Sequence, residues 1–320
     1  MLARLAILFD PLVRLLLLAI LLATIVPVTG EGRAVARTAS DAAIFVLFLL
    51  NGLRLPRSAV VGALRNLRFL LPLVLFVFGW MGLVGFSAAE LAKVELPASI
   101  VLGFMFLGVL PSTVQSATAY TSIAGGNVAN SVIAAAALNL LGVFLTAPLL
   151  AVMSGSVMAD LDIDTLQRIG LILLLPFAIG QMLQGRFGKA VSDNRHLISW
   201  ADRIAIALAV YVSFSGAVEQ DVWRLLSPPL WGLLLTLIGL MMAQAFFGAW
   251  WLSALLRLPD HDRIAFLFGG AQKSIAMGAP LAAILFPPET AGLVLLPVLI
   301  YHLLQMIVSA PLAARFSRSG

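Results

Sequence analysis

Two polar motifs in an otherwise apolar chain carry side chains that can bind an ion or a polar solute. One is Pro-Ser-Thr-Val-Gln-Ser-Ala-Thr at residues 111–118, and the other is Gly-Gly-Ala-Gln-Lys-Ser at residues 269–274. Proline and glycine weaken the helical backbone ladder, and the freed carbonyls and amides need polar partners away from lipid. Both motifs therefore predict interrupted helices that line a binding site. Close helix packing by small residues is the alternative interpretation.

Lys273 is the one basic residue that falls in the middle of an apolar segment. All fifteen acidic residues and the other nineteen of the twenty basic residues fall in predicted loops or at segment ends. A buried ammonium costs several kcal/mol unless it is paired or neutralised, and no segment offers a carboxylate partner. Lys273 therefore either sheds its proton or binds backbone carbonyls and an incoming anion. A fixed tether that never titrates is the structural alternative.

The composition is that of an integral membrane protein. Of its 320 residues 61% are hydrophobic and only 11% are charged, whereas a water-soluble domain carries about 25% charged residues. This excludes a soluble domain, a disordered chain and a nucleic-acid binder. The absence of cysteine excludes disulfides, thiolate metal sites and a cysteine nucleophile. The net charge of +5 fits the arginine surplus of cytoplasmic loops.

Ten segments have the length and hydropathy of spanning helices, which need about 20 mostly apolar residues. An all-α membrane fold in a single domain over residues 1–320 follows. The segments are 11–28, 38–53, 67–87, 97–123, 127–153, 164–184, 201–218, 229–256, 260–286 and 289–315.

The basic residues are unevenly divided between the two sides of the predicted membrane. An excess of lysine and arginine marks cytoplasmic loops, so both termini are predicted to lie in the cytoplasm, with the protein in the cell membrane. The predicted cytoplasmic loops carry Arg54, Arg57, Arg65, Arg68, Arg186, Lys189, Arg195, Arg203, Arg257, Arg263, Arg315 and Arg318. The opposite loops carry only Arg33, Arg37, Lys93, Arg168 and Arg224.

The fourth and fifth segments resemble the ninth and tenth. Asn139-Leu-Leu is followed by Thr-Ala-Pro-Leu at 146–149, and His302-Leu-Leu by Ser-Ala-Pro-Leu at 309–312, at identical spacing. Upstream, Gln115-Ser116 corresponds to Gln272-Lys273-Ser274. Two halves, residues 11–153 and 164–315, hold five segments each and begin on opposite sides, so the repeat must be inverted. Chance similarity between Leu- and Ala-rich helices is the alternative.

The run Leu-Pro-Ser-Thr-Val-Gln-Ser at 110–116, continued at 121–128, resembles the bile acid:sodium symporter family. Residues 48–55, 175–181 and 272–274 extend the resemblance over nearly the whole chain. The similarity is greatest to the divergent SBF-like branch, which includes a human member linked to calcium regulation.

The resemblance implies ten helices in two inverted repeats, divided into a panel and a core. The panel would comprise about residues 11–53 and 164–218. The core would comprise about residues 67–153 and 229–315, with broken helices 4 and 9 crossing inside it. Members of this family move organic anions, such as bile acids and related sulfated or carboxylated compounds, together with sodium.

The resemblance places sodium ligands on some residues of this chain and removes others. The second hydroxyl of helix 5 falls on Ala135, the shared carboxylate of helix 9 falls on or beside Phe268, and a helix 3 glutamine falls near Pro72. Coupling to sodium or to protons is therefore open, with Lys273 replacing a bound sodium or serving as counter-ion to the substrate. The retained sodium ligands are Gln115, Ser116, Ser131 and Gln272.

These observations predict a secondary transporter of a small organic anion that works by alternating access in a lipid bilayer, with no cofactor other than a possible Na⁺. The alternatives are a non-transporting regulator of calcium homeostasis and, weakest, a membrane enzyme. For Asn127, Asn139 and His302, helix capping or hydrogen bonding between helices is an equal interpretation. The predicted substrate and ion site comprises Thr113, Gln115, Ser116, Asn127, Ser131, Asn139, Gln272, Lys273, Ser274 and His302.

Overall fold

The computed structural model describes residues 10–55, 66–155, 167 and 170–317, and every regular element within them is helical. Seven helices in this part of the chain have the length and apolar composition to cross a membrane, as expected for a multi-pass membrane protein. Arg57, Arg65, Arg168 and Arg318, with the start of the predicted segment 164–184, lie outside the described residues.

The long helices follow the predicted segments and extend past them into polar sequence. Hydropathy detects only the apolar part of a helix, so the predicted starts are late. The α3 helix begins eight residues before its predicted start, and α12 begins six residues before its own. The continuous helices are α2 (Pro11–Ile25), α3 (Gly30–Arg54), α9 (Val128–Ser154), α11 (Leu175–Asp193), α12 (Arg195–Glu219), α14 (Pro228–Leu255) and α17 (Pro288–Phe316), with a single turn α13 (Val222–Leu225).

The third segment is one span with a widened turn in its middle. It comprises α5 (Leu67–Val74), the π-helix η1 (Leu75–Trp80) and α6 (Met81–Ala92). Pro72 lies inside α5 and lacks the N–H of a regular helical bond, and the π-helix follows three residues later. A second π-helix, η3 (Gly170–Leu174), leads into α11.

Two helices are interrupted where the polar motifs lie, which confirms the predicted breaks. The first pair is α7 (Ala98–Val109) and α8 (Gln115–Ile123), joined by an extended segment, residues 110–114, that we name crossover 1. The second pair is α15 (Asp260–Ala271) and α16 (Ile275–Leu285), joined by residues 272–274, named crossover 2. Both first halves contain twelve residues and follow a proline cap.

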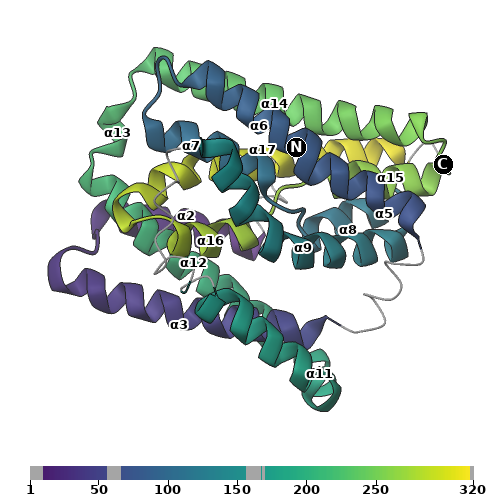
Figure 1. Cartoon of the computed structure of the whole chain (residues 1–320), viewed down its shortest axis with the longest axis horizontal. Helices are drawn as coiled ribbons and strands as arrows, with labels where there is room; N and C mark the ends of the chain where they lie inside the picture. Colours follow the sequence, from purple (N-terminus) through teal and green to yellow (C-terminus); the bar gives the residue numbers. More distant parts are fainter. Residues whose placement is uncertain (1–9, 56–65, 156–166, 168–169, 318–320) are drawn as a thin grey trace.

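The helices fall into two groups by packing (Figure 1). The helices α2, α3, α11 and α12 pack mainly against one another, and we name them the four-helix layer. The remaining helices, α5 to α9 and α14 to α17, form the crossover bundle. Contact between the groups runs chiefly through α12, which packs against α16 and α17 as well as α2 and α3.

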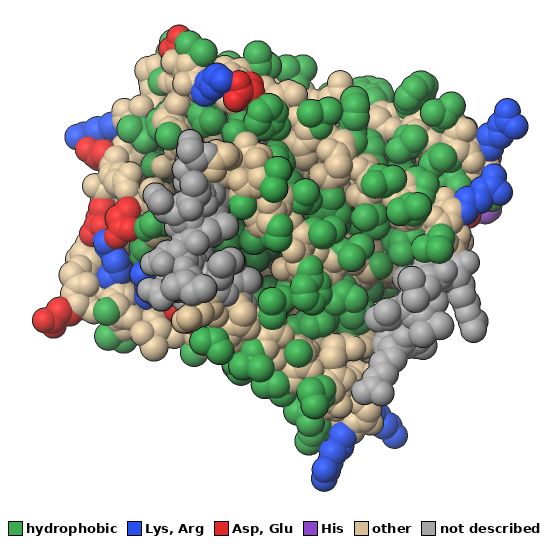
Figure 2. All heavy atoms as spheres, in the orientation of Figure 1, with side chains coloured by type: hydrophobic (Ala, Val, Ile, Leu, Met, Phe, Trp, Pro, Cys, Tyr) green, Lys and Arg blue, Asp and Glu red, His purple; other side chains and the backbone are tan. Residues whose placement is uncertain are grey.

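The surface fits a lipid environment. Hydrophobic side chains cover the middle of the face in Figure 2, while most charged side chains gather at its edges. Exposed apolar residues include Phe247 and Trp251 of α14. Within the bundle, α6 and α7 approach closely at Gly85 and Gly108, where an added Cβ at either glycine would collide with the other helix. This close approach places the C-terminal end of α7, where the last carbonyl groups lie, near η1.

Candidate functional site

The two crossovers touch each other directly at the centre of the crossover bundle. The backbone N–H of Ser274 donates to the carbonyl of Pro111 at 2.9 Å. The hydroxyl of Ser116 donates to the Gln272 Oε1 atom at 2.9 Å. Each interruption thus supplies groups that satisfy the other, as an extended backbone at membrane depth requires.

Lys273 extends from crossover 2 and binds the backbone around crossover 1. Its Nζ donates to the carbonyl oxygens of Val77 at 3.1 Å, Gly108 at 2.7 Å and Leu110 at 2.9 Å. The side chain is 1% exposed. An ammonium has three N–H donors, so all of them are used on carbonyls of η1, the end of α7 and crossover 1. Of the predicted alternatives for Lys273, this geometry corresponds to the binding of backbone carbonyls.

Two further carbonyls, one at the end of α7 and one in crossover 1, accept hydrogen bonds from side chains of α9. The Thr146 hydroxyl of α9 donates to the carbonyl of Val109 at 3.1 Å, and the Asn139 amide donates to that of Ser112 at 2.9 Å. Asn139 therefore faces the crossover, as expected for an amide that avoids lipid. Within the crossover, the Thr113 and Ser116 hydroxyls are hydrogen-bonded to each other.

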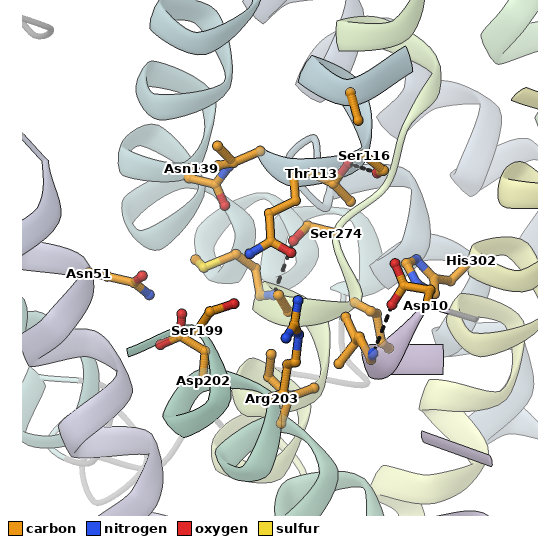
Figure 3. A pocket seen from close by; sticks show the side chains of 18 of the residues that line it. Asp10, Asn51, Thr113, Ser116, Asn139, Ser199, Asp202, Arg203, Ser274 and His302 are labelled. Atoms are coloured by element: carbon orange, nitrogen blue, oxygen red, sulfur yellow. Dashed lines mark hydrogen bonds between the residues drawn. The ribbon is translucent and has the colours of Figure 1, made fainter. Parts of the chain in front are cut away.

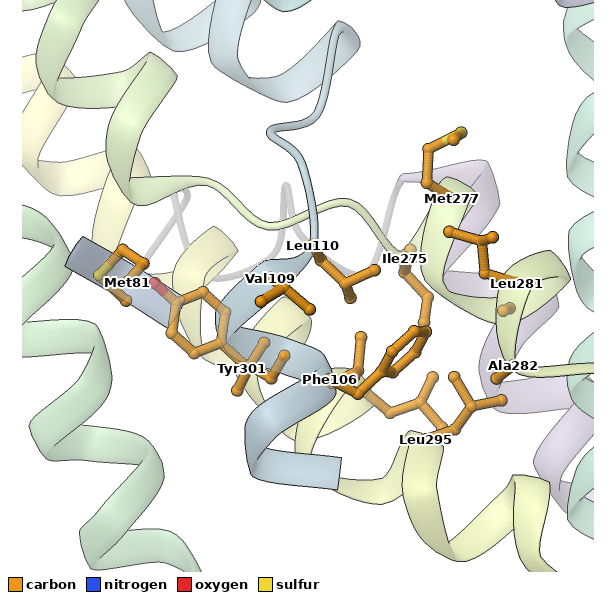
Figure 4. Close-up of a cluster of buried hydrophobic side chains, with 14 of the residues drawn as sticks. Met81, Phe106, Val109, Leu110, Ile275, Met277, Leu281, Ala282, Leu295 and Tyr301 are labelled. Carbon is orange, nitrogen blue, oxygen red and sulfur yellow. The ribbon is translucent and has the colours of Figure 1, made fainter. Parts of the chain in front are cut away.

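Crossover 2 is held in the same way by α17. Gln305 pairs with the backbone of Lys273, accepting from its N–H at 2.7 Å and donating to its carbonyl at 3.0 Å. The Tyr301 hydroxyl donates to the carbonyl of Ala271 at 2.8 Å, and its ring lies among buried apolar side chains that include Met81 and Val109 (Figure 4). The Gln272 amide donates to the Ser309 hydroxyl at 2.7 Å. The sequence analysis did not single out Gln305 or Tyr301, because only the packing of α17 brings them to the crossover.

His302 takes its protonation state from this arrangement. The oxygen of the Gln305 amide accepts from the Lys273 N–H, so the Gln305 Nε2 atom faces the His302 Nδ1 atom at 2.9 Å. An amide nitrogen only donates, so Nδ1 must accept and the imidazole is neutral with its proton on Nε2. His302 is nearly buried and lies beside Asp10 at the edge of a cavity (Figure 3).

A cavity of about 370 Å³ lies between the four-helix layer and the crossovers, close to the lower end of the size range of small-molecule sites. Figure 3 shows polar side chains reaching it from both sides. From the layer it is lined by Asp10, Leu12, Leu47, Asn51, Arg54, Ser199, Asp202, Arg203 and Ile206, and from the bundle by Thr113, Val114, Gln115, Ser116, Ala119, Tyr120, Asn139, Ser274, Ile275, Ala276, Met277, His302 and Met306.

The charged groups of the cavity come from the four-helix layer. Arg54 at the end of α3 forms an ion pair with Asp202 of α12 at 2.6 Å. Asp10 caps α2, where its carboxylate accepts from the backbone N–H groups of Leu12 and Val13. The sequence analysis assigned Arg203 to a cytoplasmic loop, whereas it lies on α12 and lines the cavity. Among the described residues, the bundle contributes neutral polar and apolar groups to the cavity.

A sequence model of the SBF-like CPA transporter family matches residues 10–318, nearly the whole chain. The chain belongs to this SBF-like transporter family. Escherichia coli YfeH, whose name includes the word symporter, is 34% identical over 312 residues, or 97% of this chain and 93% of YfeH. The Pseudomonas aeruginosa protein PA2026 is 34% identical over 95% of this chain and 91% of its own. Mouse sodium/bile acid cotransporter 7 is 23% identical over 86% and 82% of the two chains.

The predicted site residues of this SBF-like transporter separate into three groups. Gln272 and Lys273 are buried in crossover 2 and do not line the cavity. Asn127 caps α9 by accepting from the Asn130 N–H and donates to Asp262, and Ser131 accepts from Thr121, so these two take part in other contacts. The residues that line the cavity are Thr113, Gln115, Ser116, Asn139, Ser274 and His302.

The pairing of the two glutamines in the repeat needs a correction. Gln115 is the first residue of α8, after its break, and is exposed to the cavity. Gln272 directly follows α15, before the second half-helix begins, and is fully buried. The two residues lie on opposite sides of their breaks because crossover 1 is longer than crossover 2. Matching by residue type across a break of variable length shifted the register.

The four residues that the resemblance assigns to sodium offer no carboxylate, and three of them are hydrogen-bonded to other side chains. Sodium is a hard cation that takes oxygen ligands. Phe268, on or beside which the resemblance places the shared carboxylate, is fully buried, and its ring packs against that of Tyr120 at 5.8 Å between centroids. Lys273 occupies three carbonyl oxygens nearby in the fold. Of the four retained ligands, Ser116 and Gln272 bind each other, and Ser131 binds Thr121.

Proposed function

We propose that this protein is a secondary active transporter that carries a small organic anion across the cell membrane by alternating access. The observation that carries the proposal is the polar cavity between the four-helix layer and the crossovers. Relatives whose names include symporter and sodium/bile acid cotransporter support transport as the general activity. Organic anions are proposed as the substrate class because Arg203 lines the cavity and, unlike Arg54, forms no ion pair among the described residues.

We infer ten membrane crossings in two inverted repeats. The seven long apolar spans, α2 and the two interrupted pairs add up to ten. Supporting the repeat, each interrupted pair is followed by a long helix whose side chains bind the preceding crossover. Repeats of five helices that begin on opposite sides of a membrane are related by inversion. The four-helix layer then corresponds to the panel, and the crossover bundle to the core.

At the Glu219 end of α12, away from the cavity, the four-helix layer and the crossover bundle are in direct contact. This closed end supports alternating access. Arg33 of α3 forms ion pairs with Glu219 of α12 and Glu289 of α17, linking the layer to the bundle. The backbones also meet there, since a Cβ at Gly216 would overlap the Pro288 carbonyl oxygen and one at Gly292 that of Ser213. The arginine distribution makes this end extracellular, so the cavity belongs to an inward-facing state.

We propose that the ammonium of Lys273 takes the place of a sodium ion in this transporter. Its support is the set of three carbonyl bonds, together with the buried Phe268, on or beside which the resemblance places the carboxylate. A covalently attached cation of this kind makes transport independent of sodium. Coupling then rests on protons, or the lysine is a fixed tether and transport runs down the gradient of the substrate.

Uptake into proteoliposomes tests this proposal. Purified protein is reconstituted, and uptake of taurocholate, estrone sulfate and benzoate is measured with a sodium gradient, a pH gradient or neither. We expect uptake of at least one anion without sodium. Acceleration by an inward sodium gradient would refute the replacement of sodium by Lys273. An absence of flux for all three probes would favour the regulatory alternative, and acceleration by a pH gradient would distinguish proton coupling from a fixed tether.

Cysteine accessibility tests the alternating-access step. The chain has no cysteine, so Ser213→Cys, buried beneath the Arg33 ion pairs, gives a single reporter. A membrane-impermeant maleimide added outside intact cells should label it slowly, and faster when Glu289→Gln weakens the closed end. Val94→Cys, 77% exposed in a loop predicted to be extracellular, is the control and should be labelled at one rate in both backgrounds. Equal rates at Ser213→Cys would argue against a gate at this position.

A further inference from the structure

The cavity holds one cation without an ion-pair partner among the described residues, Arg203. Its guanidinium lies over the ring of Trp200 on the same helix, 5.4 Å from the ring centroid. Figure 3 shows the side chain rising from α12 into the centre of the pocket. Stacking on an aromatic face limits the directions that the guanidinium can adopt, so the charge is presented to the cavity in a restricted orientation.

The two carboxylates that line the cavity, Asp10 and Asp202, contact other groups, but the Oδ1 atom of Asp202 is buried without a hydrogen-bond donor among the described residues. Asp202 accepts the ion pair of Arg54 at 2.6 Å, and the Asp10 carboxylate caps α2 through two backbone N–H groups. The Nε atom of Arg203 is buried and has no hydrogen-bond acceptor among the described residues. A buried donor without an acceptor is costly, so Arg203 gains most from an anion that enters the cavity.

We propose that Arg203 is the residue that binds the acidic group of the substrate, a carboxylate, sulfate or sulfonate. This inference rests on the proposed transport function and extends it to a recognition residue and a headgroup. The planar fork of arginine matches two oxygens of one acidic group, which a lysine cannot reproduce. The apolar part of the substrate would lie against Ile206, Ile275 and Met306, which line the same cavity. The substrate is therefore a compact amphipathic monoanion.

Because Arg203 lies on α12, an anion that it binds can connect the two groups of helices during transport. The α12 helix is the element that connects the four-helix layer to α16 and α17, and the polar groups of the opposite wall, which include Ser274 and the Nε2–H of His302, are neutral among the described residues. An anion held by Arg203 bridges the two walls. Binding of the acidic group thus joins the layer to the bundle on the cavity side.

The test compares Arg203→Gln, Arg203→Lys and a matched control, Arg195→Gln, which removes the same charge from an exposed position on the same helix. Binding is measured by ligand-induced thermal stabilisation with two pairs of probes, benzoate with benzamide and estrone sulfate with estrone. The KM and kcat of uptake are measured for each anion that the wild type transports. Melting temperatures without ligand establish that each variant is folded.

For Arg203→Gln we expect a KM for the anion that is roughly 10- to 100-fold higher, the range for a lost charge-assisted hydrogen bond, with kcat little changed. Arg203→Lys should recover part of this loss, and Arg195→Gln should match the wild type. Selectivity for the anion over its neutral partner should fall in Arg203→Gln alone. A folded Arg203→Gln variant that retains wild-type anion selectivity would overturn the inference. Absence of anion binding and uptake in the wild type would instead count against the proposed function.

Discussion

The two crossovers meet at one point of the fold but satisfy their backbone groups with different chemistry. At crossover 1, the ammonium of Lys273 binds three carbonyls around the break, and Asn139 and Thr146 bind two more. At crossover 2, neutral side chains of α17, chiefly Gln305 and Tyr301, bind the backbone. The same structural problem is thus solved once with a charge and once without.

The lengths of the crossovers explain the difference. Crossover 1 contains five residues and follows a helix end next to the π-helix η1, so several carbonyls lie close together without helical partners. Crossover 2 contains three residues, and one glutamine spans its backbone. A lysine ammonium is a compact group with three donors, which suits a cluster of carbonyls that face one another. We therefore expect the removal of a supporting side chain to lower the free energy of unfolding more at crossover 1 than at crossover 2.

The largest effect should come from Lys273→Met, which keeps the length of the side chain and removes all three donors. Three buried carbonyls would lose their partner, and we expect a loss of about 3–5 kcal/mol in the free energy of unfolding, the range for breaking a buried polar pair. Denaturant unfolding in detergent measures the change, with Lys189→Met at an exposed position as control. A loss under about 1 kcal/mol would mean that the ammonium is not needed to hold crossover 1.

Gln305→Leu should have the next largest effect. It breaks both bonds to the Lys273 backbone and releases His302, which we expect to cost about 2–3 kcal/mol. Gln305→Glu refines the comparison, because a carboxylate still accepts from the Lys273 N–H but cannot donate to the Lys273 carbonyl or to His302. Unfolding of both variants is followed as for Lys273→Met. If Gln305→Leu proves more destabilising than Lys273→Met, the ranking of the two crossovers is reversed.

Asn139→Ala should cost less, about 1–2 kcal/mol, because it removes one amide from crossover 1 while Lys273 remains. Asn194→Ala, which removes an exposed amide bound to the Ala190 carbonyl, is the control and should change stability little. A double-mutant cycle with Lys273→Met measures the coupling between the two supports of crossover 1. Strict additivity would mean that they act on independent parts of the backbone.

Ser116→Ala should have the smallest effect, about 0.5–1.5 kcal/mol. It removes the side-chain bond between the crossovers, to Gln272, but leaves the backbone bond between Ser274 and Pro111 in place. Ser87→Ala, at an exposed position where the hydroxyl bonds to its own helix, serves as control. A loss as large as that of Lys273→Met would show that the contact between crossovers, rather than the support of each one, holds the centre together.

Much of the frame could be predicted from the sequence, for physical reasons that act locally. Proline and glycine beside polar residues inside apolar segments predicted both breaks, since they weaken the helical backbone and the freed groups need polar partners away from lipid. Lys273 stood out because every other charge lies at a segment end. Arg203 was misplaced by the same reasoning, because it lies three residues into the predicted segment 201–218 and was counted with the loop charges, although the helix begins eight residues before it.

The sequence by itself determined the membrane class, the positions of the breaks and the presence of one internal cation, because composition and local backbone chemistry fix these. Only the tertiary structure decided what each polar group binds. Lys273 reaches carbonyls of η1 and α7, and Gln305 reaches crossover 2, through contacts between segments distant in the chain. Hydrogen bonds need partners within about 3 Å, and the packing of helices, rather than their order in sequence, brings those partners together.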